Sequence, residues 1–157
     1  MTGLPARERL EATVRAVEGE APADGPVIGI GWATVELGRG LTELATALGI
    51  GPEAFLEAPS SEALGARCVV ASGGLGGGIA VVVLEPSTEG RLAARLARHD
   101  EGPAVIWHGA AGMTPSRDQA PPTTPGPFGP ERPLPPVPGR PDLLRFIVDV
   151  SPGTIRA

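Results

Sequence analysis

The chain has 157 residues with 13 basic and 18 acidic side chains, which gives a formal net charge of −5. This length suits one domain with a hydrophobic core and is short for two. The acidic balance gives no general attraction to phosphate backbones, so we expect no nucleic-acid partner. No stretch approaches the roughly 20 apolar residues of a membrane span, and the N-terminus lacks a signal-peptide core. We therefore expect a cytoplasmic protein with no membrane partner.

Every basic residue is an arginine, and aromatic residues make up only 3% of the chain. We interpret this as a compositional bias rather than as a set of selected guanidinium sites. On that basis Arg9, Arg91, Arg95 and Arg98 are predicted to lie on solvated helix faces, with ligand contacts as the alternative.

The first predicted element is an amphipathic helix over residues 4–17. Leu10, Val14 and Val17 follow one another at helical spacing and form one apolar face. We expect this helix to dock against the domain as an appendage. Residues 19–25 contain Pro and Gly in a turn-like pattern and predict a linker.

The domain itself is predicted to begin with a strand over residues 26–37, whose glycines let a second backbone or a ligand come close. A helix over residues 41–48 follows and ends at Gly49. Residues 51–63 are predicted to form a linking stretch with at most one helical turn.

Residues 79–84 form a continuous apolar run, mostly β-branched, that is too short for a helix. Such a run predicts a strand that is buried on both faces. A strand over residues 66–71 precedes it through a glycine-rich hairpin at 72–78. An Arg-rich helix follows and stops at Gly102-Pro103, and a further strand covers residues 104–107.

Prolines and glycines dominate residues 113–141, so this segment is predicted to be an extended linker that cannot hold a central strand. A proline-rich ligand for SH3-type domains is the alternative. Residues 143–150 are apolar on both sides and predict a last strand inside a sheet, either in the same chain or in a partner. The expected segments are residues 1–25, 26–112, 113–141 and 142–157.

Few side chains in this sequence suit catalysis or metal binding. The chain has one Cys and two His residues, too few for a dedicated metal site, so we expect neither a metal nor a cofactor. Cys68 lies in an apolar run and is predicted to be a small core residue rather than a nucleophile. The glycines at 73–78 precede a strand instead of opening a helix, which favours a hairpin over a phosphate loop. His108 at a strand end is a better functional candidate than His99.

Several stretches together resemble a known family, the glyoxalase / bleomycin-resistance / dioxygenase (vicinal oxygen chelate) superfamily, and look most like its methylmalonyl-CoA epimerase-like branch. The stretches are residues 32–37, 41–49, 84–86, 89–96 and 101–103. The resemblance implies an α+β fold in which a βαβββ module forms a curved mixed sheet. The C-terminal strand would complete this sheet.

The metal-ligand positions of that family correspond here to residues 29–31, Val82, and Ala104 or Val105. All are glycine or apolar, so the resemblance implies that the metal site is absent. The Pro-rich segment implies that the second module is degenerate. Because one curved half-sheet would leave an apolar face open to water, we expect a homodimer.

Three functions remain open at this stage. The first is a binding protein that holds a small, largely apolar molecule in the concave face of the sheet. Its expected lining residues are Ile30, Trp32, Val81, Val83, Trp107 and His108. The second is a metal-independent lyase or isomerase in which Glu36 and Glu85 act as acids and His108 as the general base. The third is a structural domain of a homo-oligomer.

Overall fold

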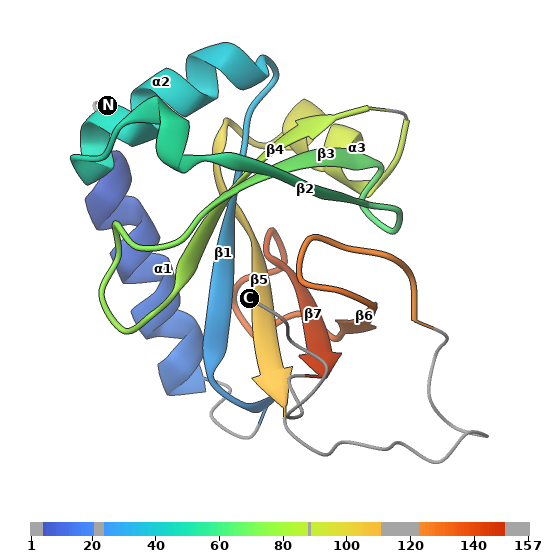
Figure 1. The fold of residues 1–157 in the computed structure, drawn as a ribbon. Helices are drawn as coiled ribbons and strands as arrows, with labels where there is room; N and C mark the ends of the chain where they lie inside the picture. The colour runs from blue at the N-terminus through green and yellow to red at the C-terminus, as the bar shows by residue number, and fades with distance from the viewer. Residues whose placement is uncertain (1–4, 21–23, 88, 111–122, 150–157) are drawn as a thin grey trace.

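The structure is a computed structural model that describes residues 5–20, 24–87, 89–110 and 123–149. The described part contains three α-helices, one 3-10 turn and a seven-stranded sheet (Figure 1). In chain order the elements are α1 (Ala6–Glu20), β1 (Val27–Ala33), α2 (Leu37–Leu48), η2 (Pro52–Ala54), β2 (Leu56–Ser61), β3 (Ala66–Ala71), β4 (Ala80–Pro86), α3 (Arg91–Arg98), β5 (Gly102–Ala110), β6 (Glu131–Leu134) and β7 (Leu144–Asp149).

The sheet has the strand order β2-β3-β4-β1-β5-β7-β6. β1 pairs in parallel with β4, and β5 pairs in parallel with β7. The two inner strands β1 and β5 run antiparallel to each other. Each half therefore repeats one pattern, an inner strand followed by a parallel and then an antiparallel neighbour. This mixed, curled sheet confirms the predicted α+β class and the βαβββ module.

The parallel pair β1 and β4 needs a crossover, and α2 lies on this connection. The Glu36 side chain accepts hydrogen bonds from the backbone N–H groups of Gly38 and Arg39, which starts the helix at Leu37. The prediction placed this start four residues later, at residue 41, and extended the first strand to residue 37, whereas β1 ends at Ala33. Gly49 has φ +69° and ends the helix as predicted.

Helices α1 and α2 lie on one face of the sheet (Figure 1). The prediction that α1 is an appendage is wrong. Leu10 and Val17 have no exposed surface and belong to the same core cluster as Leu44 of α2 and Ile106 of β5. The opposite face carries a second core around Trp107, which α3 also joins through its own buried leucine.

Two edge strands were not predicted. β2 forms within the expected linking stretch, and β6 forms within the Pro-rich segment, where Pro133 is tolerated because β6 is an edge strand. β7 lies between β5 and β6 of the same chain, so the predicted last strand is internal and pairs in cis.

Parts of some predictions lie outside the described residues. These parts are residues 1–4, 21–23, 113–122 and 150–157. Among the helices of the described ranges, none is long and apolar enough to cross a membrane.

Candidate functional site

The six residues predicted to line one concave surface lie on both faces of the sheet. Four of them belong to the core beneath α1 and α2: Ile30, Trp32, Val81 and Val83. Trp107 belongs to the core of the opposite face, and His108 is fully buried. Successive residues of a strand point to opposite faces, so the six cannot share one cleft. This corrects the expected lining, and the face of Trp107 becomes the candidate site.

The predicted acids Glu36 and Glu85 both accept hydrogen bonds from backbone N–H groups at the start of α2. Glu36 caps the helix, and Glu85 Oε2 accepts a 2.8 Å hydrogen bond from the backbone N–H of Leu37. His108 pairs with Val27 at the other end of β1, roughly 20 Å away along the strand. The structure therefore does not bring the predicted acid–base set together.

His108 is held in a buried polar network. Its Nδ1 donates to the carbonyl oxygen of Gly25 at 3.0 Å, so Nε2 is the atom that accepts from Arg145 at 3.2 Å. Arg145 in turn binds Asp24 at 2.7 Å. Burial lowers the pKa of His108, and the positive charge of Arg145 acts in the same direction. The imidazole is neutral and structural, and it does not face a cleft.

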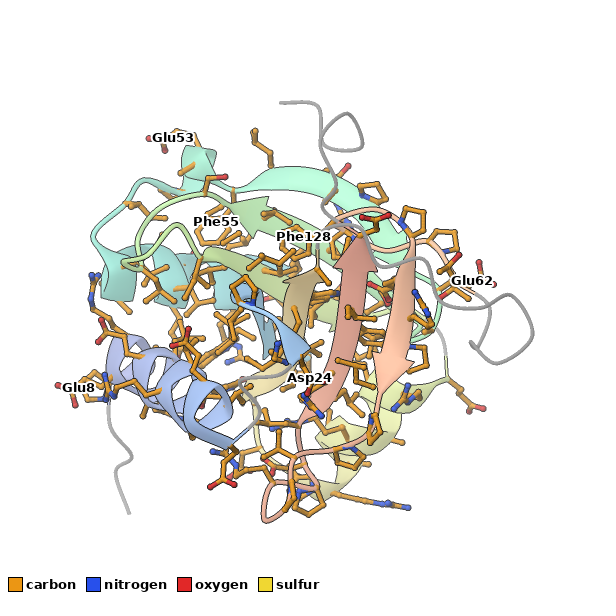
Figure 2. The ribbon with its side chains drawn as sticks, turned by 90° about the horizontal axis from the view of Figure 1, so that it is seen from below. Glu8, Asp24, Glu53, Phe55, Glu62 and Phe128 are labelled. Carbon is orange, nitrogen blue, oxygen red and sulfur yellow. The ribbon has the colours of Figure 1, made fainter. Side chains whose placement is uncertain are left out.

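The inner side of the curled sheet, which carries Trp107, is filled by aromatic and aliphatic side chains. A Cβ atom placed on Gly29 would lie 2.5 Å from the ring of Phe128, and one on Gly31 would lie 2.6 Å from Leu84. Trp107 meets Phe128 edge-on at 5.3 Å between ring centroids. Figure 2 labels Phe128, which enters this space from the segment before β6.

A buried carboxyl group lies beside these rings. Glu131 has no exposed surface, its Oε1 accepts from Trp107 Nε1 at 2.9 Å, and its Oε2 accepts from Ser61 Oγ at 2.7 Å. Burial raises the pKa of Glu131 above the ordinary value of a glutamate. The sequence analysis missed this residue because it lies among prolines. The available signal was a Glu-Arg pair at 131–132, one of the few charged positions of that segment.

Residues 123–130, here called the closing segment, join the two edges of the sheet. The backbone N–H of Glu62, just after β2, donates to the carbonyl of Pro125 at 3.1 Å. Thr124 and Glu131 exchange two backbone hydrogen bonds of 2.9 and 2.8 Å. The sheet thus curls until β2 and β6 are bridged by their own chain.

A cavity of about 380 Å³ lies at this closure. It is lined by Pro59, Thr123, Thr124, Pro125, Gly126, Gly129 and Pro130. The buried hydroxyl of Thr124 has no hydrogen-bond partner among the described residues. Gly126 separates the cavity from Glu131, because a Cβ atom there would overlap the carboxylate. The cavity is therefore apolar. The Thr124 hydroxyl is itself buried from solvent, and one carboxyl group lies behind Gly126.

Cys68 lies on the same face and is fully buried. Burial raises the pKa of its thiol to about 12, and its Sγ lies 3.8 Å from the carbonyl oxygen of Ala66. The thiol stays protonated at neutral pH, which suits a core residue rather than a nucleophile.

Comparisons with known proteins identify the fold. No family model and no curated protein match the chain. A variant of Streptomyces coelicolor methylmalonyl-CoA epimerase, in complex with 2-nitronate-propionyl-CoA, is 20% identical with a TM-score of 0.61, and the match covers 85% of this chain and 99% of that one. The Mycobacterium tuberculosis methylmalonyl-CoA epimerase is 15% identical with a TM-score of 0.57, and the match covers 80% of this chain and 88% of that one. A hypothetical protein from Bacillus halodurans is 18% identical with a TM-score of 0.58, and the match covers 78% of this chain and 92% of that one. The chain has the glyoxalase fold.

In this glyoxalase fold the positions matched to the family's metal ligands lie together. Gly31, Val82 and Val105 all contribute to the inner face, and none carries a donor atom in its side chain. Within the described ranges no three His, Cys, Asp or Glu residues form a group that could hold a metal ion. The absence of a metal from the protein stays a prediction.

Proposed function

We propose that this glyoxalase-fold protein binds a small, largely apolar molecule in the cavity beside the closing segment. The observation that carries the proposal is the cavity of about 380 Å³, which is lined mainly by prolines and glycines. Its volume falls within the range of about 300–1,000 Å³ that is usual for ligand sites.

The packing of the inner face supports a site at the rim of the sheet. Trp107, Phe128 and Leu84 occupy the space above the glycines of β1, so a ligand finds room only farther out. Proline rings and glycine backbone lose little conformational freedom when a ligand binds, because they have no rotatable side chains.

The polar groups narrow the kind of ligand. Thr123 is the exposed threonine of the lining, and a hydroxyl both donates and accepts, so the cavity suits one polar group on an otherwise apolar molecule. A strongly charged ligand is disfavoured, since no charged side chain lines the cavity.

The test uses two neighbouring positions on β2. Pro59 lines the cavity, whereas Ser60 is exposed and does not. A thermal-shift screen of small apolar alcohols, ketones and acids should find a ligand that stabilises the full chain, by about 2.7 kcal/mol at a hundred times its Kd. Pro59→Trp should abolish this shift, and the matched Ser60→Trp should keep it. Loss of the shift in both variants, or in neither, would contradict the assigned cavity.

A second candidate is a metal-independent isomerase or lyase with Glu131 as the acid–base group. The observation in its favour is that a carboxyl with a raised pKa lies behind Gly126 at the cavity wall. Two of the solved neighbours are named epimerases, which keeps this reaction class open. An activity found in an isomerase screen should be lost in Glu131→Gln at every pH. An activity that survives in Glu131→Gln would remove this candidate and leave the binding function.

We also propose that the protein is a cytoplasmic homodimer. The apolar face that the sequence predicted to be open is covered by the chain's own closing segment and by α3, so it does not support a dimer. Support now comes from Leu56, which is 69% exposed on the edge strand β2. An apolar residue on an unpaired edge favours pairing with a second copy.

A further inference from the structure

A groove with five arginines lies between α1, α3 and the turn before β7. Two adjoining cavities, of about 210 and 280 Å³, share Arg95 and Asp142 as lining residues. The other basic residues that line them are Arg91, Arg98, His99, Arg9 and Arg140. Five of the 13 basic residues of an acidic chain thus converge on one groove. The sequence analysis predicted solvated helix faces for four of them, yet Arg9 and Arg95 are partly buried.

Arg95 is fixed by neutral groups. Its guanidinium donates to the carbonyl oxygens of Asp100 at 2.9 Å, Pro103 at 2.9 Å and Asp142 at 3.3 Å. Carbonyl groups orient a cation without cancelling its charge. Burial is the main reason that the pKa of Arg95 is lowered; the charge of Arg9 acts in the same direction, while the carboxylates of Asp142 and Asp100 oppose it. The groove therefore holds like charges close together in partly desolvated positions.

Arg9 and Arg91 are held by aromatic rings. The guanidinium of Arg9 lies 5.0 Å from the centre of the Trp32 ring and donates to the carbonyl of Glu101 at 3.3 Å. Arg91 lies 5.9 Å from the ring of Phe146. Cation–π contacts also leave the positive charge in place. Both side chains are thus positioned before any ligand arrives.

Most arginines elsewhere in the described chain have a carboxylate partner. Four of the six outside the groove form an ion pair: Arg7 with Glu11, Arg39 with Glu101, Arg67 with Glu57, and Arg145 with Asp24. In the groove the structure shows one such pair within the described ranges, Arg140 with Asp142 at 3.6 Å. The five arginines of the groove therefore outnumber its one lining carboxylate, Asp142, and leave a local excess of positive charge.

We infer that this groove binds a small molecule through a phosphate or pyrophosphate group. Guanidinium forks match the oxygens of such groups and donate to them in pairs. Asp142 lies where the two cavities adjoin, with Arg91 and Arg98 in one and Arg9 and Arg140 in the other, so a diphosphate can present one phosphoryl group to each pair of arginines. The groove lies at the Leu144 end of β7, roughly 13 Å along the strand from Val148, the partner of Glu131. It is thus a separate site that does not depend on the proposed apolar ligand.

The test is a titration of the full chain with inorganic pyrophosphate at low ionic strength, followed by calorimetry and by phosphorus NMR. Arg91→Gln and Arg98→Gln remove exposed charges from the groove, and neither residue forms an ion pair with a described residue. The matched control Arg67→Gln removes the same charge from β3. We expect each groove variant to weaken Kd by about three- to tenfold and the double variant by more, while the control stays within about twofold.

Three results would overturn the inference. The first is a titration with pyrophosphate that gives neither heat nor a change in the phosphorus chemical shift. The second is a loss of pyrophosphate affinity in Arg67→Gln as large as in the groove variants. The third is a citrate affinity equal to that for pyrophosphate, which would show a surface that accepts any polyanion. Pro59→Trp fills the apolar cavity and should leave pyrophosphate binding unchanged, so a failure of the cavity proposal and a failure of this one are distinguishable.

Discussion

Ser61 Oγ donates a 2.7 Å hydrogen bond to Oε2 of Glu131, and this bond joins strands at opposite edges of the sheet. Both side chains are buried, with 1% and 0% exposure. The same carboxyl accepts from Trp107, so one residue satisfies two donors from β2 and β5. One carboxyl group therefore links β2 and β5 to β6, beside the candidate site.

Replacing Glu131 should test this dependence. Glu131→Ala leaves two buried donors without an acceptor and opens a cavity, so we expect a loss of about 2–4 kcal/mol in the free energy of unfolding. Ser61→Ala removes only one donor and should cost about 1 kcal/mol. Urea unfolding measures both values. Equal and small effects would mean that the edges are held together by the backbone bonds of the closing segment alone.

Glu101 should make the protein sensitive to acid. Its Oε2 accepts from Arg39 at 2.7 Å, from Thr34 Oγ1 at 2.8 Å and from the backbone N–H of Val35 at 2.6 Å. The hydrogen bond from Arg39 is the main reason that its pKa is lowered to about 2. A lowered pKa stabilises the fold above the unfolded value near 4.5, and this contribution is lost as pH falls toward 2.

The size of this effect follows from the partial exposure of Glu101. After allowance for screening by solvent, we expect about 1–2 kcal/mol between pH 5 and pH 2. Glu101→Gln should flatten that part of the stability curve measured by urea unfolding at several pH values. An unchanged acid slope in this variant would assign the acid sensitivity to other carboxylates.

Gly31 should tolerate no side chain. A Cβ atom there would lie 2.6 Å from Leu84 and 3.0 Å from Trp107, so Gly31→Ala is expected to destabilise the fold by about 1–3 kcal/mol. Gly76 has nothing within 4 Å of an added Cβ and no positive φ. Gly76→Ala should therefore change stability by less than about 0.5 kcal/mol. A stable Gly31→Ala variant would show that the inner face is looser than the structure indicates.

Leu56 should decide the oligomeric state. The protein is expected to elute as a dimer, and Leu56→Lys should give a folded monomer because edge lysines oppose strand pairing. Val35 is similarly exposed, at 62%, but lies outside the edge strand, so Val35→Lys is the control. Light scattering after size-exclusion chromatography measures the mass of each. A monomeric parent protein would refute the dimer proposal.

The elements that could be predicted are those whose signal is local. The apolar run at 79–84 and the glycine at the end of α2 determine a strand and a helix terminus by their own chemistry. β2 and β6 were missed because an edge strand with prolines and small polar residues acquires its structure from its partner strand.

The candidate site was harder to predict for the same reason. His108 looked accessible because it was placed at a strand end, yet Gly25 and Arg145 enclose it. Glu131 looked like a linker residue, and its burial depends on a strand 70 positions earlier. The pattern of apolar and polar residues within one segment does not indicate a contact with a distant segment.

The 70-residue separation between Ser61 and Glu131 also sets an order of events in time. Contacts between residues far apart in sequence form late in folding, because the chain must first lose the entropy of closing a long loop. During synthesis the βαβββ module emerges first. The part of its inner face that the closing segment covers stays exposed to solvent until that segment and Glu131 leave the ribosome. A chaperone that shields apolar strands would therefore find its substrate in the nascent chain, in the interval between the emergence of β4 and that of β6.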